Sequence, residues 1–147
     1  MNTLKFISIP IWINNIYHND GHGRIEKKHF SLIAKKDIDA ETHIIHPISQ
    51  FILDNWRQKQ FNTQKKHSMN TIKFLNYLIQ NKNNLKIKTL TDLTINDGTQ
   101  YLNSLSNEDI SRETIIDIER TLNKFFIWLS ENNYSTKINS SDFKIRR

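Results

Sequence analysis

The first third of the chain has the residue pattern of β-strands. Three segments in it are rich in β-branched and aromatic residues, and polar, turn-forming residues separate them. These segments are residues 4–13, 29–34 and 42–45. Pro10 fits only an edge strand, and Asn19, Asp20 and Gly21 favour a turn after the first segment. Residues 1–46 are therefore predicted to form a small β hairpin or sheet.

After Pro47, apolar residues recur at the three- and four-residue steps of amphipathic helices. The first predicted helix follows Pro47 and contains Ile48, Phe51, Ile52 and Trp56; Thr63 caps the second, which ends near Asn81. Thr94 caps the third, whose inner face is Gly98, Tyr101, Leu102 and Leu105; Ser111 caps the fourth, which carries Ile115, Ile118, Leu122, Phe125 and Leu129 up to Asn132. Residues 47–134 thus predict a four-helix bundle, and the fold class is mainly α with a small N-terminal β hairpin or sheet.

The second predicted helix has two kinds of side. Its core-facing stripes are Ile72, Leu75 and Ile79 on one line and His67, Thr71, Phe74 and Leu78 on the adjoining one. A polar stripe at helical spacing consists of Asn62, Lys66, Asn70, Lys73 and Tyr77. We expect this polar stripe to be exposed, either as a solvated helix face or as a ridge that contacts a ligand.

Basic residues are concentrated in one part of the chain. The 147 residues carry a net charge of +6. No Asp or Glu occurs from Asn55 to Thr91, where eight Lys and Arg residues lie, whereas seven acidic residues face only Arg112 from Asp92 to Glu119. The molecule is therefore predicted to have two oppositely charged sides, and the basic side favours a polyanionic partner such as nucleic acid.

Several kinds of chemistry lack the residues that they need. The chain has no Cys, which excludes disulfides, thiol nucleophiles and thiolate metal sites. The apolar segment Phe6 to Ile13 is too short to cross a membrane. A zinc site is conceivable from His18, Asp20 and His22, with His43 and His46 nearby, but two His in a glycine turn without a defined third ligand are usually solvent-exposed. We expect no metal, no other cofactor and no small-molecule substrate.

Three sequence segments follow one another in a recognisable order. They are TQKKHSMNTIKFLNYL from Thr63, LTDLTINDGTQYLNSL from Leu90 to Leu105, and a last helix that begins SRETI at Ser111 and ends FFIWL from Phe125. In this order and spacing, residues 47–134 resemble the core-binding domain of tyrosine recombinases of the phage integrase type, a four-helix fold sometimes called SAM-like. The resemblance implies a DNA-binding domain that grips duplex DNA at a recombination site for integration or excision.

The same resemblance implies what this chain does not do. The family's catalytic domain follows the core-binding domain and uses an Arg, a Lys, a His-x-x-Arg pair and a nucleophilic Tyr, and none of the six His here has an Arg three residues later. We therefore expect no catalytic residue in this chain, and residues 135–147 are expected to begin a linker to a catalytic domain. The full-length parent would be a strand-exchange recombinase that assembles as a tetramer in the cytoplasm, at the bacterial nucleoid or encoded by a phage.

The candidate DNA-binding residues lie on the second and fourth helices, which are expected to face the duplex. They are Thr63, Lys65, Lys66, Asn70, Lys73 and Arg112. Lysines neutralise phosphates, Asn70 could bond an adenine edge, and the amides after Thr63 form a seat for a phosphate. Trp12, Trp56 and Trp128 are interpreted as packing residues of the core or of a domain interface, not as base-stacking platforms. The alternative is a protein-binding module that docks a partner on its acidic helices and does not bind nucleic acid.

Overall fold

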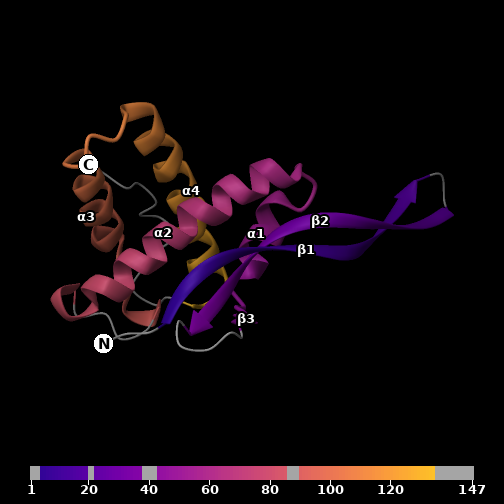
Figure 1. Ribbon diagram of the computed structural model, residues 1–147, viewed down its shortest axis with the longest axis horizontal. Coiled ribbons are helices and arrows are strands. Elements are labelled where there is room, and N and C mark those ends of the chain that lie inside the picture. The colour runs from indigo at the N-terminus through magenta and orange to yellow at the C-terminus, as the bar shows by residue number, and fades with distance from the viewer. Residues whose placement is uncertain (1–3, 20–21, 38–42, 86–89, 135–147) are drawn as a thin grey trace.

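The described part of the chain contains a long β hairpin, a short third strand and a set of α-helices (Figure 1). In this computed structural model the described residues are 4–19, 22–37, 43–85 and 90–134, with side chains described at 5–12, 29–36, 44–81 and 90–134. The mainly helical fold with a small N-terminal antiparallel sheet confirms the fold class that the sequence predicts.

The sheet is built on two long antiparallel strands. β1 (Leu4–Asn19) pairs with β2 (His22–Asp37) along its whole length, in a register that runs from Leu4 opposite Asp37 to Asn19 opposite His22. β3 (His43–Ile45) pairs antiparallel with the end of β2 and completes the order β1-β2-β3. Both hairpin strands are longer than predicted, because ladder hydrogen bonds extend pairing through polar residues that carry no hydrophobic alternation. The predicted turn residues Asp20 and Gly21 lie outside the described residues.

The helices follow the predicted order. They are α1 (Ser49–Trp56), α2 (Phe61–Leu85), α3 (Ile95–Ser106) and α4 (Arg112–Glu131), with a short 3₁₀ turn at Leu90–Asp92 before α3. Two predicted caps are confirmed. Thr94 and Asp97 form a reciprocal capping box at α3, and the Ser111 hydroxyl accepts a hydrogen bond from the Thr114 amide at α4.

The predicted bounds of α2 are wrong at both ends. The helix begins at Phe61 and runs to Leu85, whereas the sequence suggested a start after Thr63 and an end near Asn81. The Gln64 amide already donates to the Gln60 carbonyl, so Thr63 lies inside the first turn and does not cap it. The amides that follow Thr63 are therefore part of the helical ladder. They do not form the free phosphate seat that was expected there.

The predicted apolar stripes form one core. Every inner-face residue predicted for α1, α3 and α4 is buried, and so are Ile72, Phe74, Leu75 and Leu78 of α2. Ile33 of β2 belongs to the same cluster. The sheet, which precedes Pro47, and the helices, which follow it, therefore share one core. Trp56 and Trp128 are buried, which confirms their interpretation as packing residues.

Polar side chains of the helices bind the edges of the hairpin. The Asn76 side chain bonds both backbone groups of Phe6 in β1, at 2.8 and 3.1 Å. On β2, Gln64 and Ser68 bond the Ser31 backbone, while the Ser49 hydroxyl bonds both backbone groups of Ile33. These strand groups point away from the β1–β2 ladder, and side chains take the place of a neighbouring strand. The hairpin is thereby fixed across α2.

Candidate nucleic-acid interface

α2 lies between two different neighbours. Its contacts extend to β1 and β2 on one side and to α3 and α4 on the other, as Figure 1 shows. The residues proposed from sequence to bind DNA fall on both sides of this helix. Whether each of these side chains is buried or exposed therefore depends on the element that it contacts.

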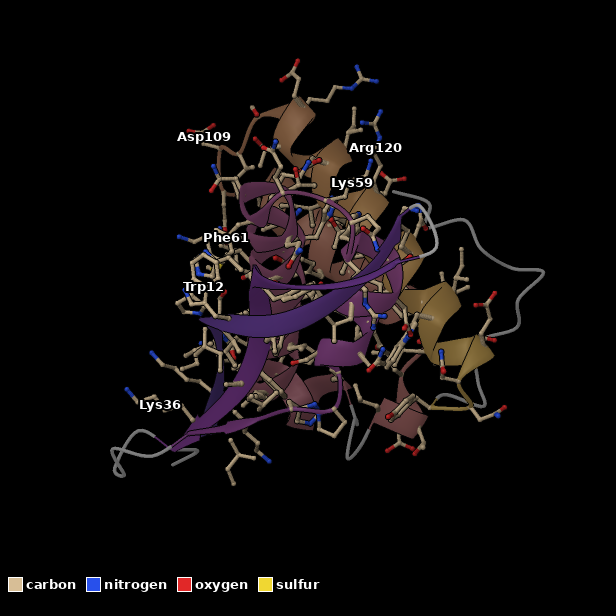
Figure 2. The ribbon with its side chains drawn as sticks, turned by 90° about the vertical axis from the view of Figure 1, so that its right-hand side faces the viewer. Trp12, Lys36, Lys59, Phe61, Asp109 and Arg120 are labelled. Atoms are coloured by element: carbon tan, nitrogen blue, oxygen red, sulfur yellow. The ribbon has the colours of Figure 1, made fainter. Side chains whose placement is uncertain are left out.

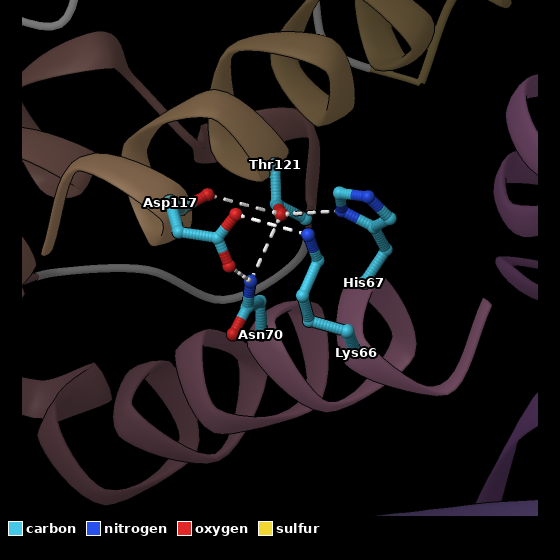
Figure 3. A network of polar contacts seen from close by, with 5 residues as sticks. All are labelled: Lys66, His67, Asn70, Asp117 and Thr121. Atoms are coloured by element: carbon cyan, nitrogen blue, oxygen red, sulfur yellow. Dashed lines mark hydrogen bonds and ion pairs between the residues drawn. The ribbon is translucent and has the colours of Figure 1, made fainter. Parts of the chain in front are cut away.

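On the α4 side, α2 takes part in a polar network (Figure 3). The Lys66 ammonium lies 3.1 Å from the Asp117 carboxylate. The Asn70 amide nitrogen donates to Asp117 at 3.3 Å and to the Thr121 hydroxyl at 3.0 Å, and His67 Nδ1 lies 2.8 Å from the same hydroxyl. This network pairs the basic helix with the acidic part of the chain and joins α2 to α4.

Burial and charge control the titration of the network. Burial, together with the neighbouring Lys66, lowers the pKa of His67 to about 4, so its imidazole is neutral at physiological pH. The His67 ring also stacks on Trp56, with ring centroids 3.9 Å apart. Burial works to raise the pKa of Asp117, but the hydrogen bonds from Lys66 and Asn70 outweigh it and hold that pKa below its usual value. The carboxylate therefore stays charged and keeps its partners.

This geometry overturns the expectation of a continuous exposed ridge on α2. Asn70 is only 9% exposed and its amide nitrogen is engaged by α4, so it does not present that donor to a base edge. Lys66 is half exposed but holds an ion pair, and Tyr77 packs against Tyr101 of α3. The stripe fails as a ridge because α4 covers its middle. Asn70, His67 and Thr121 are buried at that contact, and each has a side-chain hydrogen bond to a neighbouring residue.

On the side that faces the hairpin, α2 and β1 form a basic groove of about 580 Å³. Lys5 of β1 and Lys65 and Lys73 of α2 line it, and all three side chains are exposed. No Asp or Glu occurs among the described residues that line the groove. Phe6, Pro10, Met69 and Ile72 add apolar side chains to its lining. The arrangement concentrates positive charge along a concave surface, where acidic side chains do not neutralise it.

A stack of three aromatic rings lies at one end of this groove. His29 of β2 is stacked between Trp12 of β1 and Phe61 at the start of α2, with centroid distances of 4.5 and 3.8 Å and interplanar angles of 8° and 2°. His29 and Phe61 also line the groove, and Figure 2 shows Trp12 and Phe61 on the same side of the molecule. Trp12 is 64% exposed, so it is not a core residue, and its other interpretation, as a residue of a domain interface, stays a prediction.

The other two candidate residues lie apart from the groove. Thr63 is half-buried in the first turn of α2. Arg112 is exposed at the first position of α4 and lines a separate, shallow hollow with Ile110 and Glu119. Of the six candidates, the groove thus brings together only Lys65 and Lys73.

Sequence reasoning missed Lys5, Trp12, His29 and Phe61. The lysines Lys65 and Lys73 share a helical stripe with Met69, Ile72 and Asn76, and this spacing could have indicated one face. The contribution of β1 had no such signal, because the packing of β1 against α2 joins residues as far apart in the sequence as Phe6 and Asn76, which are 70 positions apart.

Comparisons of this chain with protein-family models, with curated proteins and with solved structures find no match. Within the described ranges there is no group of three or more metal-ligating side chains; those of His18, Asp20, His22 and His43 lie outside the described side chains. No helix in those ranges is long and apolar enough to cross a membrane.

Proposed function

We propose that this chain is a DNA-binding domain that grips duplex DNA through the basic groove between α2 and β1. The observation that carries the proposal is the convergence of Lys5, Lys65 and Lys73 on one concave surface without an acidic residue among its described lining. Phosphates contribute most of the affinity of protein–DNA binding, and unpaired surface lysines are the groups that neutralise them.

The proposal extends to the family that the sequence resembles. The chain would serve as the core-binding domain of a site-specific tyrosine recombinase, without the residues that cut and rejoin DNA. Support comes from the segments that follow one another from Thr63 to Leu129 and from the four helices that the described residues form in that order. The parent protein would exchange strands as a tetramer, while this chain supplies binding alone.

The two sides of α2 would then have different tasks. Lys65 and Lys73 contact phosphates from the groove side, whereas Lys66 and Asn70 hold α4 in place from the other. In this assignment, two of the residues that the sequence suggested as DNA-binding, Lys66 and Asn70, have a structural role instead. Arg112 is exposed at the start of α4, so it can make a further phosphate contact outside the groove.

Salt-dependent binding tests the proposal. The double variant Lys65→Ala/Lys73→Ala removes two groove charges, and each lysine that neutralises a phosphate contributes about 0.9 to the slope of log affinity against log salt. We expect the slope to shrink by roughly 1.8 in this variant. Fluorescence anisotropy with a labelled duplex at several salt concentrations measures it.

The matched control is Lys66→Ala/Lys124→Ala, which removes one lysine from α2 and one from α4, away from the groove, and has the same net charge as the groove double variant. Lys124 is exposed on α4. This control should keep nearly the full slope. Equal loss of slope in both double variants would mean that net charge, and not the groove, governs binding. Absence of salt-dependent binding in the wild type would favour the protein-binding alternative, with its acidic surface on α3 and α4.

A cleavage assay tests the expected lack of catalysis. Supercoiled DNA incubated with the chain should stay unnicked, and no covalent protein–DNA adduct should survive denaturing electrophoresis. A phosphotyrosyl adduct on any tyrosine of the chain would contradict the assignment.

A further inference from the structure

The ring stack of Trp12, His29 and Phe61 has an exposed outer end. His29 is occupied on both faces, by Trp12 on one and by Phe61 on the other. Trp12 uses one indole face for His29 and stays 64% exposed. Exposing a large, flat, apolar ring to water is unfavourable in free energy. Exposed aromatic residues of this kind are enriched at binding surfaces.

The stack is firmly positioned. Trp12 and His29 are directly opposite each other in the β1–β2 register, so the ladder sets their spacing. Phe61 is held at the start of α2, whose Gln64 and Ser68 side chains bond the Ser31 backbone two residues beyond His29. The outer indole face is therefore presented in a fixed orientation, at little further cost in conformational entropy when a ligand stacks on it.

The surroundings of the stack decide which planar ligand fits. His29 and Phe61 are shared with the groove that Lys5, Lys65 and Lys73 line. Ser8, Pro10 and Trp12 alternate along β1 and so lie on one face of the sheet, and Ser8 and Pro10 line the groove. A ligand that extends from the stack into the groove needs a flat ring at one end and negative charges beside it. A nucleotide strand has both, with its base next to its phosphates.

We propose that Trp12 is a stacking platform for an unpaired base, whose neighbouring phosphates lie along the lysines of the groove. The inference rests on the proposed DNA binding and specifies the form of DNA that the site prefers. A base inside a duplex stacks on its neighbours, so its ring face is not available to Trp12. The site thus favours a bulge, a frayed end or another unpaired stretch next to a duplex.

Three DNA probes separate base stacking from charge. The first is a fully paired duplex, the second is the same duplex with a short run of unpaired thymines, and the third carries abasic residues in place of those thymines. The second and third have the same phosphates and differ only in the bases. We expect the thymine probe to bind roughly 5- to 150-fold tighter than the abasic probe, the range that one base–aromatic stack supplies.

Variants of Trp12 test whether this residue causes the preference for the thymine probe over the abasic probe. Trp12→Ala should bring the thymine probe to the affinity of the abasic probe, while Trp12→Phe, which keeps a ring, should preserve much of the preference. Ile44→Ala is the matched control, since Ile44 is 76% exposed on β3 and should change neither affinity. The thymine probe should also quench tryptophan emission in the wild type and not in Trp12→Phe, because Trp56 and Trp128 are buried.

The outcomes distinguish this inference from the proposed function. Equal binding of the thymine and abasic probes by the wild type, with salt-dependent binding of the duplex intact, overturns the role of Trp12 and leaves DNA binding standing. Equal loss of affinity for all probes in Trp12→Ala also overturns it, because a general structural role would then explain the loss. If no probe binds in a salt-dependent way, DNA binding itself fails and the base platform fails with it.

Discussion

The two sides of α2 carry similar residues and are used in opposite ways. On the α4 side, Lys66 and Asn70 meet an acidic partner, Asp117, and their polar groups are engaged within the protein. On the β1 side, Lys65 and Lys73 meet a strand that contributes Lys5, and no described carboxylate pairs with them. The contrast shows that a lysine on a helix becomes structural or available for a ligand according to the charge of the packed neighbour.

The two sides also differ in how a substitution is expected to change the stability of the fold. The α4 side contains buried hydrogen bonds, and a buried polar group that loses its partner destabilises the fold. The groove side also has hydrogen bonds, such as those between Asn76 and the Phe6 backbone, but its lysines are solvated cations whose removal leaves nothing buried unsatisfied. We therefore expect mutations in the polar network on the α4 side to change stability, and mutations of the groove lysines to change binding.

The largest expected effect on stability is that of Asn70→Ala. The variant removes a buried amide that donates to both Asp117 and Thr121, and it should lower the free energy of unfolding by about 1 to 3 kcal/mol. Urea denaturation followed by circular dichroism measures this. Lys73→Ala, one helical turn further along on the groove side, is the control and should stay near the wild type. A loss below that of the control would contradict the assignment of Asn70 as a structural residue.

The next effect concerns pH. The pKa of His67 is about 4 in the folded state, below the ordinary value of 6.5 for a histidine, so between these pH values the unfolded chain binds a proton that the folded chain does not. Stability should therefore fall as pH drops from about 6.5 towards about 4. The pKa of His46 is also lowered, by burial and by Lys35, and adds a loss of the same sign.

His67→Gln isolates the first contribution. The variant cannot take up the proton, so the fall in its urea midpoint between about pH 7 and pH 5 should be smaller than in the wild type, with the His46 contribution remaining. The depressed pKa of Asp117 acts in a lower range, where stability is lost as pH falls through that pKa. An unchanged pH dependence in His67→Gln would show that the imidazole is not held neutral by the fold.

The smallest effects compare two neighbouring lysines. Lys66→Ala breaks a half-exposed ion pair with Asp117, which should cost no more than about 1 kcal/mol. Lys65→Ala should change stability by less than about 0.5 kcal/mol, since this side chain has no ion-pair partner among the described residues. Added salt should narrow the difference between the two variants. A larger loss in Lys65→Ala than in Lys66→Ala would reverse the assignment of the two sides.

The sequence by itself determined the helices and their inner faces. The three- and four-residue steps of Ile115, Ile118, Leu122, Phe125 and Leu129 predicted a buried stripe, and all five residues are buried. Thr94 and Ser111 signalled helix starts through local side-chain bonds. Such features are readable because helical period and capping depend on residues within a few positions of one another.

Only the tertiary structure decided which polar residues are available. Asn70 and Lys73 share a stripe in the sequence, but α4 covers the first and the groove exposes the second. Trp12 is a large aromatic residue of the kind that often packs in a core, but it is 64% exposed at the outer end of the ring stack with His29 and Phe61. The physical reason is that burial of a polar or aromatic side chain depends on the partner that long-range packing brings to it, and no local period in the sequence encodes that partner.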